Sequence, residues 1–290
     1  MYSDNSQEPL FKQEILIAST HHQKSINFDI RLVIEDAEPK PLVVFIHGFK
    51  GFKDWGHFNL IADNFARQGF IFVKINLSHN GTSPQDKKNI TDTESFGKQT
   101  YTKDLQDVAD VLDYLLSENY IFRASTNLDE IYLIGHSRGG AVAILAALED
   151  KRIKKIATWA SVCRSAFLFN KDNLDELDEK GVFFVENART KQKLPIYKEM
   201  YDDIMQNYQK FNLEQKIKHL EIPLLLIHGK KDTSVAPESS ENLKNWAKNA
   251  VLIFIEGADH TFGGKEPYTE ELLPVHTEEV IDETIAFFQD

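Results

Sequence analysis

The sequence predicts an α/β protein built on a mostly parallel sheet, with helices on both faces of that sheet. Short apolar runs rich in β-branched residues recur along the 290 residues, and longer amphipathic stretches separate them. Strand, helix and strand repeated in this way favour a parallel order. Residues 41–46 are apolar throughout, which is typical of a strand buried on both faces.

Eight segments are expected to form this sheet. The first two, residues 14–18 and 27–34, are predicted to be antiparallel strands, and the second alternates as a half-buried strand does. The other strands are expected at residues 41–46, 70–75, 131–134, 155–160, 223–227 and 251–255. Helices are expected at residues 57–67, 102–118, 138–148, 237–248 and 278–288.

One long stretch, residues 164–218, breaks the alternation. It shows no clear strand, is rich in Asp, Glu and Lys, and carries scattered aromatic residues. An insertion of this length is either a functional lid or a disordered linker, and disordered segments are poor in aromatic residues. We therefore expect a core of residues 1–163 and 219–290, and a small, mostly helical cap over the edge of the sheet where ligands bind.

Composition excludes several classes of partner. The net charge of −12 disfavours nucleic acids and anionic membrane surfaces, and no apolar run is long enough to span a bilayer. Cys163 is the single cysteine, so an internal disulfide is excluded, and no spacing of ligands predicts a metal or cofactor. Residues 1–14 lack the apolar core of a secretory signal. We expect a cytoplasmic monomer or homodimer.

The strongest chemical signal is the run Gly-His-Ser-Arg-Gly at residues 135–139. It follows the apolar strand 131–134 and opens the alanine-rich helix 138–148. A sharp strand-to-helix turn lifts the Ser137 hydroxyl out of the sheet, and larger residues in place of the glycines would clash. The alternative is a Gly-Ser turn that only packs a helix against a strand.

A serine nucleophile needs a base, and that base needs an acid to orient it. Asp232 follows the strand 223–227 and His260 follows the strand 251–255, so both are expected at the same edge of the sheet as Ser137. The order Ser, Asp, His along the chain is the one this arrangement uses. Each residue alone has a simpler interpretation, a turn-forming Asp or a solvated His; their joint placement predicts a catalytic triad.

Donors for an oxyanion are expected from two backbone amides. Gly48 follows the strand 41–46 and lets the chain turn over the site, so the N–H of Phe49 and the N–H of Arg138 can point at one oxygen. The neighbouring His47 is interpreted as structural.

Three rival residues are weaker. Cys163 has no second cysteine or obvious base and is interpreted as a structural thiol. His276 precedes a helix instead of following a strand, and Asp259 is too close to His260 in the sequence to orient its ring.

The stretches HGFKGF, GHSRGG, HGKKDTSV and GADHTF resemble the corresponding motifs of the α/β-hydrolase superfamily. Within it they most resemble small esterases of the feruloyl and cinnamoyl esterase-like and dienelactone hydrolase-like groups. The resemblance implies the α/β-hydrolase fold, a triad of Ser137, Asp232 and His260, and oxyanion donors at Phe49 and Arg138. Residues 76–83 depart from the form often found in these groups, so the shape of that pocket wall is not implied.

Three functions compete at this point. The first is a carboxylesterase that cleaves small-molecule esters through an acyl-enzyme on Ser137. The second is a peptidase or amidase, because the same triad cleaves amides. The third is a non-catalytic protein of the same fold that binds a small molecule or a partner; such proteins usually lack a triad residue, and here all three are present.

Overall fold

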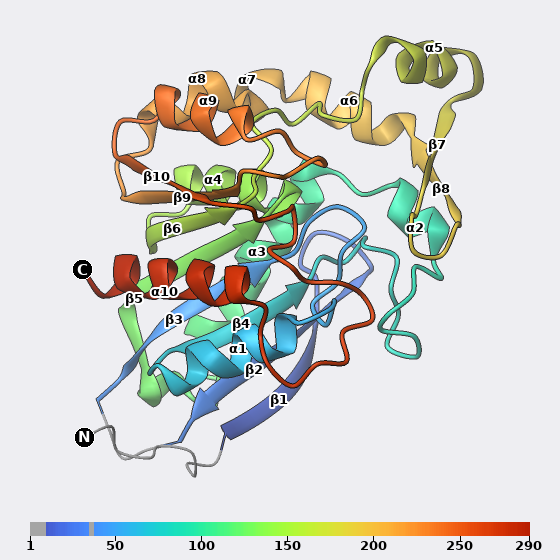
Figure 1. Cartoon of the computed structure of the whole chain (residues 1–290). Helices are drawn as coiled ribbons and strands as arrows, with labels where there is room; N and C mark the ends of the chain where they lie inside the picture. The colour runs from blue at the N-terminus through green and yellow to red at the C-terminus, as the bar shows by residue number, and fades with distance from the viewer. Residues whose placement is uncertain (1–9, 35–37) are drawn as a thin grey trace.

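The computed structural model describes residues 10–34 and 38–290 (Figure 1). Most of the segment 1–14, for which the sequence predicts no secretory signal, lies outside these ranges. Eight strands form one sheet in the order β1-β2-β4-β3-β5-β6-β9-β10. Strands β1 and β4 each pair antiparallel with β2, and the remaining pairs are parallel. Their bounds are β1 Leu10–Ala18, β2 Ser25–Val33, β3 Lys40–Ile46, β4 Ile71–Asn76, β5 Thr126–His136, β6 Ile153–Trp159, β9 Leu224–Gly229 and β10 Ala250–Ile255. The prediction of an eight-stranded, mostly parallel sheet is confirmed.

Helices cover both faces of this sheet, as predicted (Figure 1). One face packs against α1 and α10, and the other packs against α3, α4 and α9. Alternate residues of β3 divide between these two layers, because successive side chains of a strand point to opposite faces. The helices outside the insertion are α1 Phe58–Arg67, α2 Thr93–Gly97, α3 Tyr101–Leu116, η1 Arg123–Ser125, α4 Arg138–Glu149, α9 Glu238–Trp246 and α10 Val275–Gln289.

The prediction that the second strand is half-buried is wrong. Both faces of β2 are buried, and its polar residues Asp29 and Arg31 are 3% and 7% exposed. Asp29 Oδ2 lies 2.9 Å from Lys53 Nζ and 3.3 Å from Lys74 Nζ. Arg31 Nε lies 3.0 Å from Asp63 Oδ1. These polar side chains remain buried because each is paired with an opposite charge.

Replacing Asp29 by Ala is expected to lower the free energy of unfolding by about 3 kcal/mol, because Lys53 and Lys74 would stay buried with less compensation. Urea unfolding followed by circular dichroism measures this change. The matched control is Glu94→Ala, which removes an exposed partner of Lys98 and is expected to change stability by less than about 0.5 kcal/mol. Equal effects of the two substitutions would contradict the prediction.

The insertion at residues 164–218 contains strands as well as helices, so the expectation that it has no strand is wrong. Strands β7 Val182–Glu186 and β8 Lys193–Tyr197 form an antiparallel two-stranded sheet. Figure 1 shows this hairpin and α5 set apart from the main sheet. The other elements are α5 Lys171–Lys180, α6 Lys198–Gln206, α7 Tyr208–Phe211, α8 Leu213–Lys216 and η2 Ile217–His219.

A small hydrophobic cluster of its own holds the hairpin in place. Phe183, Leu194 and Ile196 pack there with Ile90 and Phe96, which belong to the core part of the chain. The division into core and cap stays a prediction. Within residues 10–34 and 38–290, no helix is both long enough and apolar enough to cross a membrane.

Candidate active site

Ser137 occupies a strained turn between β5 and α4. Its φ of 57° and ψ of −118° are rare for a residue with a side chain, and such strain is characteristic of functional sites. A Cβ at Gly135 would meet the backbone oxygen of Gly139 at 2.2 Å, and one at Gly139 would meet that of Ile46 at 2.3 Å. Both glycines are therefore required for the strand-to-helix turn that the sequence predicts.

Asp232 and His260 are joined by a hydrogen bond of 2.7 Å from His260 Nδ1 to Asp232 Oδ2. Asp232 follows β9 and His260 follows β10, where adjacent parallel strands end. With the Nδ1 proton committed to the carboxylate, Nε2 of His260 carries the lone pair of the neutral ring. The arrangement gives His260 the tautomer that a general base requires.

The Asp232 carboxylate is held in its charged form. Burial raises the pKa of Asp232, but hydrogen bonds from His228 and His260 outweigh burial and hold this pKa well below its usual range. Its second oxygen, Oδ1, accepts the backbone N–H groups of Ser234 at 2.8 Å and Val235 at 2.9 Å. The acid therefore stays ionised and fixed in orientation over the neutral pH range.

His228 is a partner of Asp232 that sequence reasoning missed. Its Nε2 donates to Asp232 Oδ2 at 3.1 Å and to the Val235 carbonyl at 2.9 Å, and its Nδ1 accepts from Ser240 Oγ at 2.7 Å. His228 is fully buried. The signal was the histidine four residues before Asp232 in the HGKKD stretch, but the sequence does not reveal which atoms meet.

Ser137 and His260 both line one cavity of about 230 Å³. Phe49, Trp55 and Phe58 supply apolar surface to the same cavity. No hydrogen bond joins the Ser137 and His260 side chains in the described part of the chain. In free enzymes such bonds are often long and tighten only in the substrate complex.

The loop after β3 lies directly against Ser137. A Cβ at Gly48 would meet the Cβ of Ser137 at 2.9 Å, so only glycine lets the backbone come this close. His47 supports the loop: its Nδ1 donates to the Gly48 carbonyl at 2.9 Å, and its Nε2 accepts from Leu77 N–H at 3.2 Å. Burial lowers the pKa of His47 to about 4, so this ring is neutral and structural.

The side chain of Arg138 is turned away from the cavity. Its guanidinium forms a buried ion pair with Asp104 and lies over the ring of Tyr101, 4.3 Å from the ring centroid. Only the backbone N–H of Arg138 therefore remains for the role expected of it.

His136, the residue before Ser137, contacts the loop that carries His260. Its Nε2 donates to the backbone carbonyl of His260 at 2.9 Å. Burial lowers the pKa of His136 to about 3, so the ring is neutral at physiological pH. This contact anchors His260 and was not foreseen from the sequence.

The rival residues lie in other surroundings. Asp259 Oδ1 accepts the backbone N–H groups of Thr261 at 3.0 Å and Gly263 at 2.9 Å, so it shapes the loop. Cys163 lines a different cavity, and His276 lies in α10. Among the residues that the structure describes, no group of His, Cys, Asp and Glu is placed to hold a metal ion.

Residues 41–185, half of the 290 residues, match the model of the alpha/beta hydrolase fold family. The chain belongs to this family. The resemblance found in the four sequence motifs is thereby confirmed, and so is the fold class.

Individual relatives agree with this membership. A Mycoplasma genitalium protein named as a candidate esterase/lipase is 25% identical over 259 residues, covering 82% of this chain and 89% of the relative. Est1E from Butyrivibrio proteoclasticus, solved with ferulic acid bound, is 22% identical with a TM-score of 0.68 over 95% of this chain and 98% of its own. Acylaminoacyl peptidase from Pyrococcus horikoshii is 16% identical with a TM-score of 0.69 over 98% of this chain and 42% of its own. Both solved structures show a shared fold.

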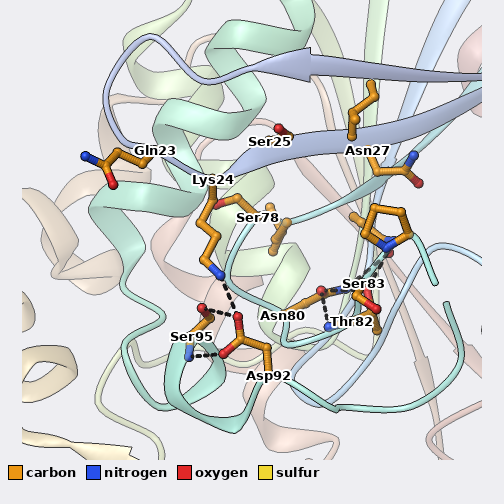
Figure 2. A pocket seen from close by; sticks show the side chains of 14 residues that line it. Gln23, Lys24, Ser25, Asn27, Ser78, Asn80, Thr82, Ser83, Asp92 and Ser95 are labelled. Carbon is orange, nitrogen blue, oxygen red and sulfur yellow. Dashed lines mark hydrogen bonds and ion pairs between the residues drawn. The ribbon is translucent and has the colours of Figure 1, made fainter. Parts of the chain in front are cut away.

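The loop of residues 76–83, which departs from the family form, borders a second cavity. This cavity measures about 320 Å³, is lined largely by polar residues and shares no lining residue with the Ser137 cavity. Figure 2 shows Lys24 and Ser95 pointing toward Asp92 on its wall, and Thr82 beside Asn80. In this α/β hydrolase the residues of the unusual loop therefore do not line the Ser137 cavity. They contact its wall indirectly, through the Leu77 N–H that donates to His47 Nε2.

Proposed function

We propose that this chain is a serine hydrolase that cleaves carboxylic esters of small molecules through an acyl-enzyme on Ser137. One observation carries the proposal: Ser137 stands on a strained turn in the same cavity as His260, whose Nδ1 is bound to Asp232 at 2.7 Å. The names of the relatives support ester substrates. We also propose that the enzyme is a cytoplasmic monomer or homodimer, which its acidic charge and single cysteine support.

The first half of the reaction transfers the acyl group. Ser137 Oγ attacks the ester carbonyl carbon while His260 Nε2 takes the hydroxyl proton. The carbonyl oxygen becomes an oxyanion, which accepts hydrogen bonds from the N–H groups of Phe49 and Arg138. Collapse of this intermediate expels the alcohol, which leaves with the proton from His260.

Water completes the cycle. It attacks the acyl-enzyme while His260 again takes a proton, and the acid is released as Ser137 regains its proton. Asp232 stays ionised throughout, because His228 and the amides of Ser234 and Val235 hold its charge in place. These steps need no cofactor or metal.

A common acyl-enzyme makes a testable prediction. Aryl esters that share one acid but differ in phenol should, with methanol added, all give the same ratio of methyl ester to free acid. The leaving group has departed before methanol or water attacks, so it cannot influence the ratio. Product analysis by chromatography measures it, and a ratio that varies with the phenol would contradict the proposed intermediate.

Hydrolysis of a matched anilide of the same acid distinguishes an amidase from an esterase. The esterase proposal expects turnover of the ester and a far lower rate with the anilide. Comparable rates for both would favour the amidase.

A further inference from the structure

Two basic residues line the Ser137 cavity. Lys50 comes from the loop after β3, and Arg189 comes from the turn between β7 and β8. No carboxylate from the described residues lines this cavity, although the whole chain carries a net charge of −12. The cavity is therefore locally positive in an acidic protein, and this sign selects among substrates.

Lys50 has a strained backbone conformation. Its φ of 61° lies in the left-handed region, which residues with a side chain occupy rarely and often at functional sites. Its half-buried ammonium donates to the Glu186 carbonyl at 3.2 Å, a neutral acceptor. The Glu186 carboxylate is itself paired with Lys191 at 3.1 Å. Within the described ranges, no carboxylate lies at ion-pair distance from Lys50.

Arg189 is also bound to neutral acceptors. Its guanidinium donates to the Lys88 carbonyl at 2.7 Å and to Asn89 Oδ1 at 3.3 Å. Asp86 is the acidic group in its neighbourhood, but that carboxylate accepts from Asn89 and does not line the cavity. Across residues 10–34 and 38–290, no carboxylate therefore lies at ion-pair distance from Arg189, which is itself a lining residue of the cavity.

We propose that Lys50 and Arg189 form an anion subsite, and that the preferred esters carry an oxyanion group, a carboxylate or phosphate, away from the scissile carbonyl. The proposal rests on the proposed function. Phe49, Trp55 and Phe58 fit the apolar body of such a molecule, and the cavity volume of about 230 Å³ limits it to a small one. Charge-assisted hydrogen bonds from two cations then fix the far end of the substrate.

The alternative is that both cations only tie the hairpin to the core. Lys50 links the loop after β3 to β7, and Arg189 links the hairpin turn to residues 88 and 89. If Lys50 and Arg189 only tether the hairpin, replacing them should lower the hydrolysis of charged and neutral esters equally. If they form an anion subsite, replacing them should lower the hydrolysis of anionic esters more than that of neutral esters.

Two matched pairs of esters test the wild-type enzyme. In the first pair the charge is on the acyl group: the mono-para-nitrophenyl ester of adipic acid against its carboxamide. In the second pair it is on the alcohol: the butyrate esters of para-hydroxybenzoate and para-hydroxybenzamide. Each kcat/KM is divided by the rate of alkaline hydrolysis of the same ester, which removes differences in intrinsic reactivity.

We expect the anionic member to be preferred about tenfold or more in at least one pair. The preference should shrink as salt concentration rises, because salt screens charges that water reaches. Lys50→Gln and Arg189→Gln should each lower the anionic-to-neutral ratio about tenfold, while Lys50→Arg and Arg189→Lys should retain most of it. The measured quantity is the ratio of kcat/KM for the anionic ester to kcat/KM for the neutral ester. A substitution at Lys50 that displaces the neighbouring Phe49 N–H would slow both esters alike and leave this ratio unchanged.

The matched control is Lys193→Gln. It removes one positive charge from the same hairpin, but its side chain is exposed and does not line the cavity, so the ratio should stay unchanged. Equal hydrolysis of both members of both pairs would overturn the subsite and leave the esterase intact. Equal losses on charged and neutral esters in Lys50→Gln and Arg189→Gln would also overturn it, in favour of tethering. If none of the four esters is hydrolysed, the proposed function is overturned, and the subsite with it.

Discussion

Replacing Ser137 by Ala is expected to lower kcat for ester hydrolysis by about a millionfold, the loss seen when a triad nucleophile is removed. The substitution deletes only the hydroxyl, and Cβ, which packs against Gly48, remains. Stability should therefore change little. A spectrophotometric assay with para-nitrophenyl butyrate measures kcat, and urea unfolding checks the fold.

The matched control for this prediction is Ser25→Ala. Ser25 is an exposed serine on the wall of the second cavity, and its loss should leave kcat unchanged. Ser137→Ala protein that keeps more than a few per cent of wild-type activity would contradict the role of Ser137.

Replacing Asp232 by Asn is expected to lower kcat by about ten-thousandfold. The Oδ1 position accepts two backbone N–H groups, so the Asn oxygen would occupy it and the amide NH2 would face His228 and His260. His260 Nδ1 would then have to accept a hydrogen bond, which places the proton on Nε2. In that tautomer the ring cannot take a proton from Ser137.

The neighbouring carboxylate supplies the control. Asp259→Asn preserves a side-chain oxygen that can accept from Thr261 and Gly263, so its loss of activity should be far smaller. Near-normal kcat/KM in Asp232→Asn, measured on the same ester, would show that another group orients His260.

The placement of the site could be predicted because it follows from topology. Ser137, Asp232 and His260 each come just after a predicted strand, and parallel strands end at one edge of the sheet. The apolar run at residues 41–46 correctly indicated a strand buried on both faces. Sequence order alone thus places the three side chains in one region, but it does not give the bond from His260 to Asp232.

Features that depend on distant partners could not be predicted. The polar residues Asp29 and Arg31 gave β2 the pattern of a solvated face, yet they are buried because Lys53, Lys74 and Asp63 neutralise them. A sequence pattern shows polarity but not which charges will meet.

The hairpin in the insertion escaped prediction for a similar reason. Its strands β7 and β8 have five residues each, too few for a clear alternation, and they are stabilised by packing on Ile90 and Phe96 far away in the chain. Likewise, His136 and His228 lie inside the GHSRGG and HGKKDTSV stretches, but only the structure shows that they contact His260 and Asp232.

The most direct test of Ser137 as an activated nucleophile is the intact mass of the protein after treatment with a fluorophosphonate. Such reagents phosphonylate serines that a neighbouring base has activated. We expect one adduct on the wild-type chain and none on Ser137→Ala, with Ser25→Ala labelled like the wild type. A folded wild-type chain that takes up no adduct, or a Ser137→Ala chain that still takes one, would contradict the proposed acyl-transfer mechanism.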